Sequence, residues 1–344
     1  MNPLRRVFLK HSVAGLAVLP FLTWTRSHAA PMGDIRFVDV DGIRTGYFEA
    51  GSGEPLVLIH GGGFGSTVSA NCFRPLVDPL AEHFHVYVID KLGQGFTDNP
   101  QNDSDYTMAA VIRHIHRFME TMGLQKVHLA GHSRGALPAI RIAVDHPEMV
   151  ENLILFNSRT LAPDDPNQPS QAAAAAAAPA QPVAAEPPTP TRGSIRQTLM
   201  SDATSYHKEF VTDEYVEAEL RVALQPKLEQ AIEKMEQLTS QWVQLNPKKM
   251  KENRRARGRW WYDDLKRETY ARIEAGRLKS PTLIIWGFND PSGRPKLGND
   301  LYRILTSVLD RTELHFFNRS GHYVFQEYPQ KTADQMVSFI RSTQ

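Results

Sequence analysis

Residues 127–140 read VHLAGHSRGALPAI, and this stretch decides the fold because two kinds of secondary structure meet at one serine. The apolar run that leads to Gly131 predicts a buried strand, and the residues after Gly135 predict a helix over 136–145. The pattern G-x-S-x-G at such a junction is typical of a sharp turn that presents the hydroxyl of Ser133 as a nucleophile. The pattern is short, so by itself it also fits a serine without a chemical role.

Other short runs rich in β-branched residues predict the rest of an eight-stranded sheet. With the strand before Ser133 (126–131), the predicted strands are IRFVDV (35–40), IRTGYFEA (43–50), PLVLIH (55–60), HVYVID (85–90), NLILFN (152–157), PTLIIWG (281–287) and TELHFF (312–317). Asp41 and Gly42 predict a hairpin between the first two, and helical patterns such as 108–122 separate later ones. The sequence therefore predicts the α/β class: a doubly wound, mostly parallel sheet with helices on both faces and an antiparallel start.

A long segment, residues 161–279, separates the sixth and seventh predicted strands. It is far longer than a crossover helix, so we expect an inserted helical lid between two parts of an α/β core, 30–160 and 280–344. Residues 163–190 are rich in Ala and Pro and predict a flexible linker, with a short alanine helix as the alternative. The pattern over 194–276 is helical, and we expect these helices to cover the carboxyl edge of the sheet.

The first 29 residues resemble an export signal. Arg5 and Arg6 precede an apolar run over residues 11–24, and SHAA at 27–30 is a small-residue cleavage pattern. The paired arginines resemble the twin-arginine signal for export of folded proteins. A membrane anchor is the alternative, but the run is short for a spanning helix. We expect cleavage after Ala29, the export machinery as a partner, a periplasmic or secreted mature protein, and no stable membrane insertion.

Composition limits the other partners. The chain has 39 basic and 38 acidic residues, and removal of residues 1–29 would leave 35 basic against 38 acidic, about −3. This balance predicts no nucleic-acid partner. Cys72 is the single cysteine, so no internal disulfide is possible. His, Asp and Glu do not cluster at the spacing of metal ligands, so we expect no metal site. The sequence has no phosphate-binding loop, so we expect no cofactor. The expected ligand is a small-molecule substrate.

Two residues near the C-terminus supply partners for the serine. His322 follows the last predicted strand, where it could take the proton of Ser133, and Asp290 follows the preceding strand, where it could orient the imidazole. Taken singly, His322 fits a surface loop and Asp290 fits a turn. The order Ser, Asp, His along the chain, each at a strand end, predicts a catalytic triad.

The sequence HGGGFG at residues 60–65 follows the third predicted strand. An attacked carbonyl develops negative charge that needs fixed donors, and glycines leave backbone amides unobstructed. We assign the oxyanion hole to the amides of Gly62 and Arg134, with Gly61 and Gly63 as neighbours that could take the same role. A merely flexible glycine turn is the alternative.

These residues together resemble the α/β-hydrolase superfamily, and most closely the meta-cleavage-product hydrolases, which cleave carbon–carbon bonds in vinylogous diketo acids. The matching stretches are HGGGFGSTVSANCFRPLVDPL, VIDKLGQGFTDN, TLIIWGFNDP and FNRSGHYVFQEYP. The resemblance implies Ser133, Asp290 and His322 as the triad, and a substrate that ketonises before its carbonyl is attacked.

The chain departs from that family's pattern at four positions. His132 stands where the family has Asn, Tyr323 where it has Trp, Phe64 where it has Pro, and Glu219 where its lid has a carboxylate-binding Arg. A glutamate would repel a substrate carboxylate unless another cation serves. The candidate substrate contacts are Gly61, Gly63, Phe64, His132, Arg221, Trp260 and Tyr323.

Three functions follow as hypotheses. The first is an exported serine hydrolase that cleaves an ester, a lactone or a ketonic carbon–carbon bond. The alternative is a carbon–carbon hydrolase of the meta-cleavage-product type. The second alternative, from a different class, is a binding protein without catalysis on a hydrolase scaffold.

Overall fold

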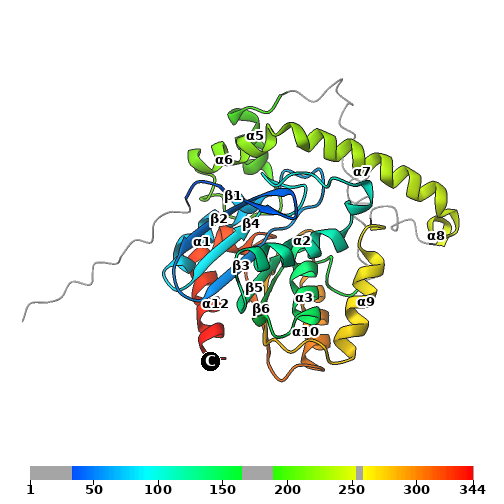
Figure 1. The fold of residues 1–344 in the computed structure, drawn as a ribbon. Helices are drawn as coiled ribbons and strands as arrows, with labels where there is room; N and C mark the ends of the chain where they lie inside the picture. The colour runs from blue at the N-terminus through cyan, green and yellow to red at the C-terminus, as the bar shows by residue number, and fades with distance from the viewer. Residues whose placement is uncertain (1–32, 165–188, 253–258, 344) are drawn as a thin grey trace, which may run out of the picture.

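The computed structural model describes residues 33–164, 189–252 and 259–343, and an eight-stranded sheet forms its centre (Figure 1). The strands are β1 (Arg36–Val40), β2 (Ile43–Gly51), β3 (Pro55–Ile59), β4 (His85–Ile89), β5 (Val127–His132), β6 (Val150–Phe156), β7 (Thr282–Gly287) and β8 (Thr312–Phe317). Their order is β1-β2-β4-β3-β5-β6-β7-β8. β1 and β4 pair antiparallel with β2, and the later pairs are parallel, which confirms the predicted class.

The hairpin between β1 and β2 forms at the predicted dipeptide. Asp41 and Gly42 have φ of 52° and 82°, the left-handed values that a two-residue hairpin turn requires. The side chain of Asp39 accepts a hydrogen bond from the Gly42 amide at 3.0 Å and closes the turn. The antiparallel start of the sheet therefore has a local cause in the sequence.

Helices cover both faces of the sheet. They are α1 (Arg74–Ala81), α2 (Met108–Thr121), α3 (Ala136–Asp145), α10 (Pro295–Thr306), α11 (Val324–Glu327) and α12 (Pro329–Arg341), with the 3-10 turns η1 (Ala70–Phe73), η2 (Asp103–Asp105) and η3 (Ser133–Gly135). One core lies between the sheet and α2, α3 and α10, and the other between the sheet and α1, α11 and α12. Burial on both faces explains why the central strands are apolar throughout rather than alternating.

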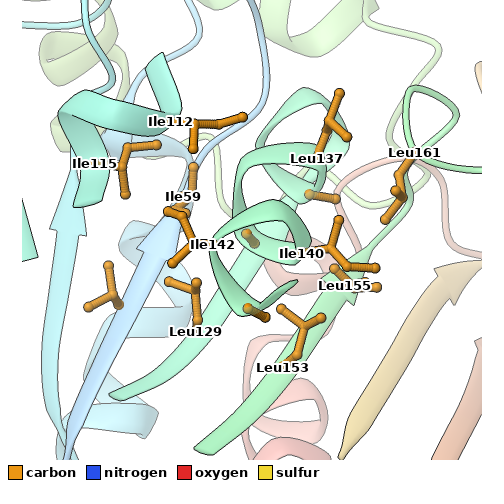
Figure 2. Close-up of a cluster of buried hydrophobic side chains, with 14 of the residues drawn as sticks. Ile59, Ile112, Ile115, Leu129, Leu137, Ile140, Ile142, Leu153, Leu155 and Leu161 are labelled. Carbon is orange, nitrogen blue, oxygen red and sulfur yellow. The ribbon is translucent and has the colours of Figure 1, made fainter. Parts of the chain in front are cut away.

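Figure 2 shows the first core at close range. Ile112 and Ile115 of α2 and Leu137 and Ile140 of α3 lie over side chains from β3, β5 and β6, labelled Ile59, Leu129, Leu153 and Leu155. The helix that begins after Ser133 is thus fixed on the sheet by its apolar face, and this rigid packing holds the serine at the strand end.

The chain between β6 and β7 contains the helices α5 (Arg192–Ser201), α6 (Asp213–Ala223), α7 (Pro226–Leu245), α8 (Pro247–Glu252) and α9 (Asp263–Glu274). In Figure 1, α5 to α8 lie together beyond one end of the sheet, whereas α9 runs beside α3. The division into core and lid stays a prediction. The expected export signal, residues 1–29, and nearly all of the expected linker, 163–190, lie outside the described residues.

In the described ranges, no helix combines the length and the apolar character that crossing a bilayer demands.

Candidate active site

Ser133 lies at the end of β5, where the chain turns sharply into α3. Its φ of 53° is in the left-handed region, which is strained for a residue with a side chain. A Cβ on Gly131 would lie 2.4 Å from the Gly135 carbonyl oxygen, and a Cβ on Gly135 would lie 2.4 Å from the Ile59 carbonyl oxygen. The Ser158 hydroxyl donates to the Ser133 carbonyl at 2.6 Å. The turn therefore brings backbone segments so close together that residues 131 and 135 must be glycine.

Asp290 and His322 are brought together from the ends of β7 and β8. His322 Nδ1 lies 2.7 Å from Asp290 Oδ2, and both side chains are buried. Because the carboxylate oxygen can only accept, Nδ1 carries the hydrogen and Nε2 is left with a free electron pair in the neutral ring. The pair thus has the tautomer that a general base needs.

Two further residues hold Asp290, and the sequence analysis missed both. The Asn157 amide donates to Asp290 Oδ2 at 2.9 Å, and the Ser292 backbone amide and hydroxyl donate to Oδ1 at 2.8 and 2.7 Å. Burial disfavours the charged carboxylate, but His322, Ser292 and Asn157 outweigh it and hold the pKa of Asp290 below its ordinary value. Asp290 is therefore an anion in place to orient His322.

His132, the residue before Ser133, contacts the His322–Asp290 pair. Its ring centre lies 4.6 Å from that of His322, and its Nε2 donates to the His322 carbonyl at 3.0 Å. Burial, together with the neighbouring His322, lowers the pKa of His132 well below its usual range, so the ring is neutral. A Cβ on Gly61 would lie 3.0 Å from both His132 Nδ1 and Ser133 Cβ, which places the glycine loop directly against the turn.

The glycine loop is held by two side chains beneath it. His60 Nε2 accepts from the Lys91 amide at 3.1 Å, so His60 Nδ1 is the donor to the Gly61 carbonyl at 2.8 Å. In a trans peptide the carbonyl and the following amide point to opposite sides, so the Gly62 N–H points away from His60. The Gly63 amide donates to the Ser66 hydroxyl at 3.3 Å. The Gly63 amide already has an acceptor, so this arrangement favours the Gly62 amide over the Gly63 amide as a donor to the oxyanion.

Lys91 is the second support of the loop. It is 1% exposed, and its Nζ donates to the Gly62 carbonyl at 3.0 Å. Burial, with a smaller contribution from Arg134, lowers the pKa of Lys91 to about 7. The adjacent Asp90 accepts from the Ala70 and Phe96 amides, so it holds the turn after β4 rather than His322.

Aromatic side chains surround the glycine loop. The ring centre of Phe64 lies 5.0 Å from Tyr106 and 5.9 Å from Trp261, and Tyr323 lies 5.2 Å from His322. Trp260 is turned away from this set, since its indole donates to the Thr239 hydroxyl within the inserted segment. Trp261, and not Trp260, therefore lies at the site. The two tryptophans are adjacent in the sequence and are distinguished by the direction of their side chains.

The two α6 residues singled out from the sequence point in different directions. Arg221 is exposed, with its guanidinium carbon 5.6 Å from the centre of the Phe96 ring, and is not brought to the triad. Glu219 faces inward, and in the described chain its buried Oε1 has no hydrogen-bond partner. Burial first and Asp90 second raise the pKa of Glu219 to about 8, against Asn71 and Arg74. At neutral pH this carboxyl is therefore mostly neutral.

The inserted segment touches the loop that carries His322. The His322 amide donates to the Thr204 carbonyl at 2.6 Å, and a Cβ on Gly321 would lie 2.0 Å from that oxygen. Thr204 lies between α5 and α6. Glycine at 321 is therefore required for the segment to approach the histidine so closely.

Among residues 33–164, 189–252 and 259–343, no group of three or more His, Cys, Asp or Glu side chains is placed to hold a metal ion.

A serine at a strained strand-to-helix turn, with a His–Asp pair from later strand ends, defines the α/β hydrolases. A sequence model described as alpha/beta hydrolase fold matches residues 54–329, and the chain belongs to this family of hydrolases.

Within the family, the chain is similar to meta-cleavage product hydrolases, as the resemblance predicted. It is 25% identical over 289 residues to 2-hydroxy-6-oxo-2,4-heptadienoate hydrolase of Pseudomonas putida, covering 84% of this chain and 90% of the relative. It is 41% identical to 2-hydroxy-6-oxo-6-(2'-aminophenyl)hexa-2,4-dienoic acid hydrolase of Metapseudomonas resinovorans, but over 127 residues, 37% of this chain and 43% of that relative. A meta-cleavage product hydrolase from Pseudomonas fluorescens IP01 shares the fold, with a TM-score of 0.64, 23% identity, and coverage of 91% and 99% of the two chains.

Proposed function

We propose that this chain hydrolyses a carbon–carbon bond next to a ketone in a vinylogous diketo acid, with Ser133, His322 and Asp290 as the catalytic residues. The observation that carries the proposal is the similarity over 84% of the chain to a heptadienoate hydrolase, combined with the buried His322–Asp290 pair. The same similarity supports a conjugated keto acid, rather than a simple ester, as the substrate class.

The residues have the following roles in the proposal. His322 Nε2 takes the proton of the Ser133 hydroxyl as Oγ attacks the ketone carbon, and Asp290 stabilises the imidazolium. The Gly62 and Arg134 amides donate to the oxyanion. Lys91 keeps the Gly62 carbonyl turned inward, so that the loop does not need to rearrange when charge develops.

Carbon–carbon cleavage needs one step before attack. A proton moves from the enol oxygen of the dienol to the carbon beside the reacting ketone, which makes that carbon a leaving group. When the bond breaks, its electron pair passes along the conjugated chain to the former enol oxygen, and the enolate takes the proton held by His322, which re-forms the enol and the neutral imidazole. The acyl group stays on Ser133 until water, deprotonated by His322, releases it as a carboxylic acid.

Stopped-flow absorbance with a coloured 2-hydroxy-6-oxo-dienoate tests the proposal. The wild type should show ketonisation followed by cleavage, and Ser133→Ala should retain the first phase and lose cleavage by roughly a thousandfold or more. Ser201→Ala, an exposed serine on α5, is the matched control. A loss below about tenfold in Ser133→Ala would remove the serine from the mechanism.

Glu219 favours a second candidate, hydrolysis of an ester or a lactone. The Glu219 carboxyl, one oxygen of which is buried, stands where the resemblance places a carboxylate-binding arginine, and a neutral acid can donate a hydrogen bond to an uncharged oxygen. Rapid turnover of esters and lactones with no turnover of the dienoate would establish this candidate in place of the first.

The helices α5 to α8 are proposed to act as a lid, and residues 1–29 as a twin-arginine export signal. The contact of Thr204 with His322 supports the lid. Arg5 and Arg6 support the signal. N-terminal sequencing of the exported protein, with Arg5 and Arg6 both changed to Lys as the control, tests the second: a mature start at Ala30 is expected, and unprocessed protein retained in the cytoplasm would contradict it.

A further inference from the structure

The side chain of Arg134 is a cation beside the nucleophile, and it has no acidic partner among the residues that the structure describes. It is half-buried, and no carboxylate of the described chain lies within ion-pair distance of its guanidinium. Other inward-facing arginines are paired: Arg141 contacts Asp145 and Glu268, and Arg259 contacts Asp164 and Asp263. A guanidinium beside the nucleophile whose donors have no acidic partner in the described chain is available to a ligand.

The guanidinium lies at the glycine loop. Its carbon is 5.9 Å from the centre of the Trp261 ring, and Nη1 is 3.4 Å from the position that a Cβ on Gly63 would take. The Trp261 ring is 3.2 Å from that same position. The Arg134 guanidinium and the Trp261 ring therefore lie against the same bare glycine, next to the turn that presents Ser133.

The charges around Arg134 add to this picture. Lys91 beneath the loop is close enough for the two cations to repel each other, and the Arg134 charge contributes to the low pKa of Lys91. The acids that adjoin His322 and Lys91 are engaged elsewhere: Asp290 is bound by His322, and Asp90 accepts from two amides. The site thus carries positive charge on the side of the glycine loop, and an anion bound there would relieve the repulsion.

We propose that the Arg134 guanidinium binds a carboxylate of the substrate, and that the enzyme selects acyl compounds carrying a carboxylate within one arginine side-chain length of the attacked carbonyl. This rests on the proposed role of Ser133 as nucleophile, but not on carbon–carbon cleavage. Arginine matches a carboxylate with two parallel hydrogen bonds, which fixes the orientation of the substrate as well as its charge. It supplies the cation that position 219 does not.

Two p-nitrophenyl esters of equal chain length test the inference. The monoester of glutarate ends in a carboxylate, and the ester of valerate ends in a methyl group. In the wild type the ratio of kcat/KM for glutarate over valerate should exceed one, and Arg134→Gln should lower it by roughly tenfold to a hundredfold, the range for a charged hydrogen bond. Arg134→Lys should retain part of the ratio, and Arg303→Gln, an exposed arginine on α10, should leave it at the wild-type value.

If the enzyme hydrolyses neither ester, binding measured by calorimetry tests the inference. The full-length protein is titrated with 5-oxohexanoate and with its methyl ester, which present the same ketone with and without the charge. Tighter binding of the anion by at least about tenfold, lost in Arg134→Gln, supports the inference. Equal affinity, binding of neither, or an unchanged preference in Arg134→Gln overturns it. A carboxylate preference that depends on Arg134, found without dienoate cleavage, would sustain this inference and refute the carbon–carbon proposal.

Discussion

Ser133 and its two flanking glycines show how sequence, backbone strain and chemistry are connected at one turn. The left-handed φ of Ser133 is unfavourable by itself, so the surrounding contacts must impose it. Gly135 makes this possible because its missing side chain lets the helix start approach the carbonyls of Ile59 and His60. A side chain there would push the serine away from the glycine loop.

We therefore expect Gly135→Ala to destabilise the fold by about 2 kcal/mol or more and to abolish activity, because the new methyl group meets rigid backbone oxygens. Urea unfolding gives the first quantity and fluorophosphonate labelling of Ser133 the second. Gly33→Ala, at a position with open space around it, should behave as the wild type. Normal stability with full labelling of Gly135→Ala would contradict this account of the turn.

Asn157 offers a test of how Asp290 is held. Asn157→Gly keeps a residue that accepts φ of 38°, but removes the amide that donates to Asp290 and accepts from the Gly287 amide. We expect kcat to fall by roughly tenfold with little change in KM, together with a loss of stability of about 1 to 3 kcal/mol.

A second buried asparagine separates the two effects. Asn152 lies near the other end of β6 and also makes two side-chain contacts, with His128 and Thr343. Asn152→Gly should reduce stability in a similar way and leave kcat within a factor of about two. An equal loss of kcat in both variants would mean that Asn157 acts through the fold and not through Asp290.

Among the secondary-structure elements, α6 is the one whose docking depends on protonation. It packs on η1, and Glu219 faces inward there with a buried oxygen. The ionisable or polar groups that face Glu219 are Asn71, Cys72, Arg74, Asp90, Tyr215 and Tyr323. Because Arg74 is the only cation in this set, ionisation of the carboxyl at this interface is poorly compensated.

This environment predicts how stability changes with pH. The pKa of Glu219 is raised to about 8, so its stabilising contribution is complete below the ordinary pKa of a glutamate and is lost as the pH rises through about 8. The Tm of the wild type should therefore fall more between pH 6 and pH 9 than that of Glu219→Gln. Glu214→Gln, an exposed glutamate of the same helix, is the control. Parallel Tm curves for wild type and Glu219→Gln would show that Glu219 is ionised across the range.

Over the whole molecule, the inserted helices are attached more lightly than the helices of the core. Ala231 is the buried residue of the 20-residue helix α7, whereas nine of the ten residues of α3 are buried. Three large apolar side chains that lie along or just before α7 are exposed: Leu224, Ile232 and Leu245. The core therefore supplies most of the cooperative stability, and the inserted helix α7 is held by few buried apolar side chains.

Hydrogen exchange should reveal this difference. We expect the amides of α7 to exchange by local opening, well before those of α3, which should exchange only on global unfolding. Mass spectrometry of peptides from 226–245 and 136–145 measures both in one experiment. Equal protection of the two helices would indicate that α7 is an integral part of the folded core.

The fold could be predicted from the sequence because its cues are local. The apolar runs gave all eight strands, and Asp41-Gly42 gave the hairpin. For the candidate site, the strand-end positions of Ser133, Asp290 and His322 follow from the α/β pattern itself, since parallel strands end at one edge. Asn157, Ser292 and Trp261 could not be found in this way. Their roles depend on which side chain crosses from one strand end to the next, and that is fixed only by the packed sheet.

The hydrogen bond between the His322 amide and the Thr204 carbonyl ties the position of the base to the position of the inserted segment. An outward displacement of the segment that takes Thr204 with it must either break this bond or pull the His322 backbone along. If the segment acts as the proposed lid, the base is misaligned while the lid is open and aligned when the lid is closed. A lid of this kind would leave Ser133 without an aligned base while substrate and product exchange with the solvent.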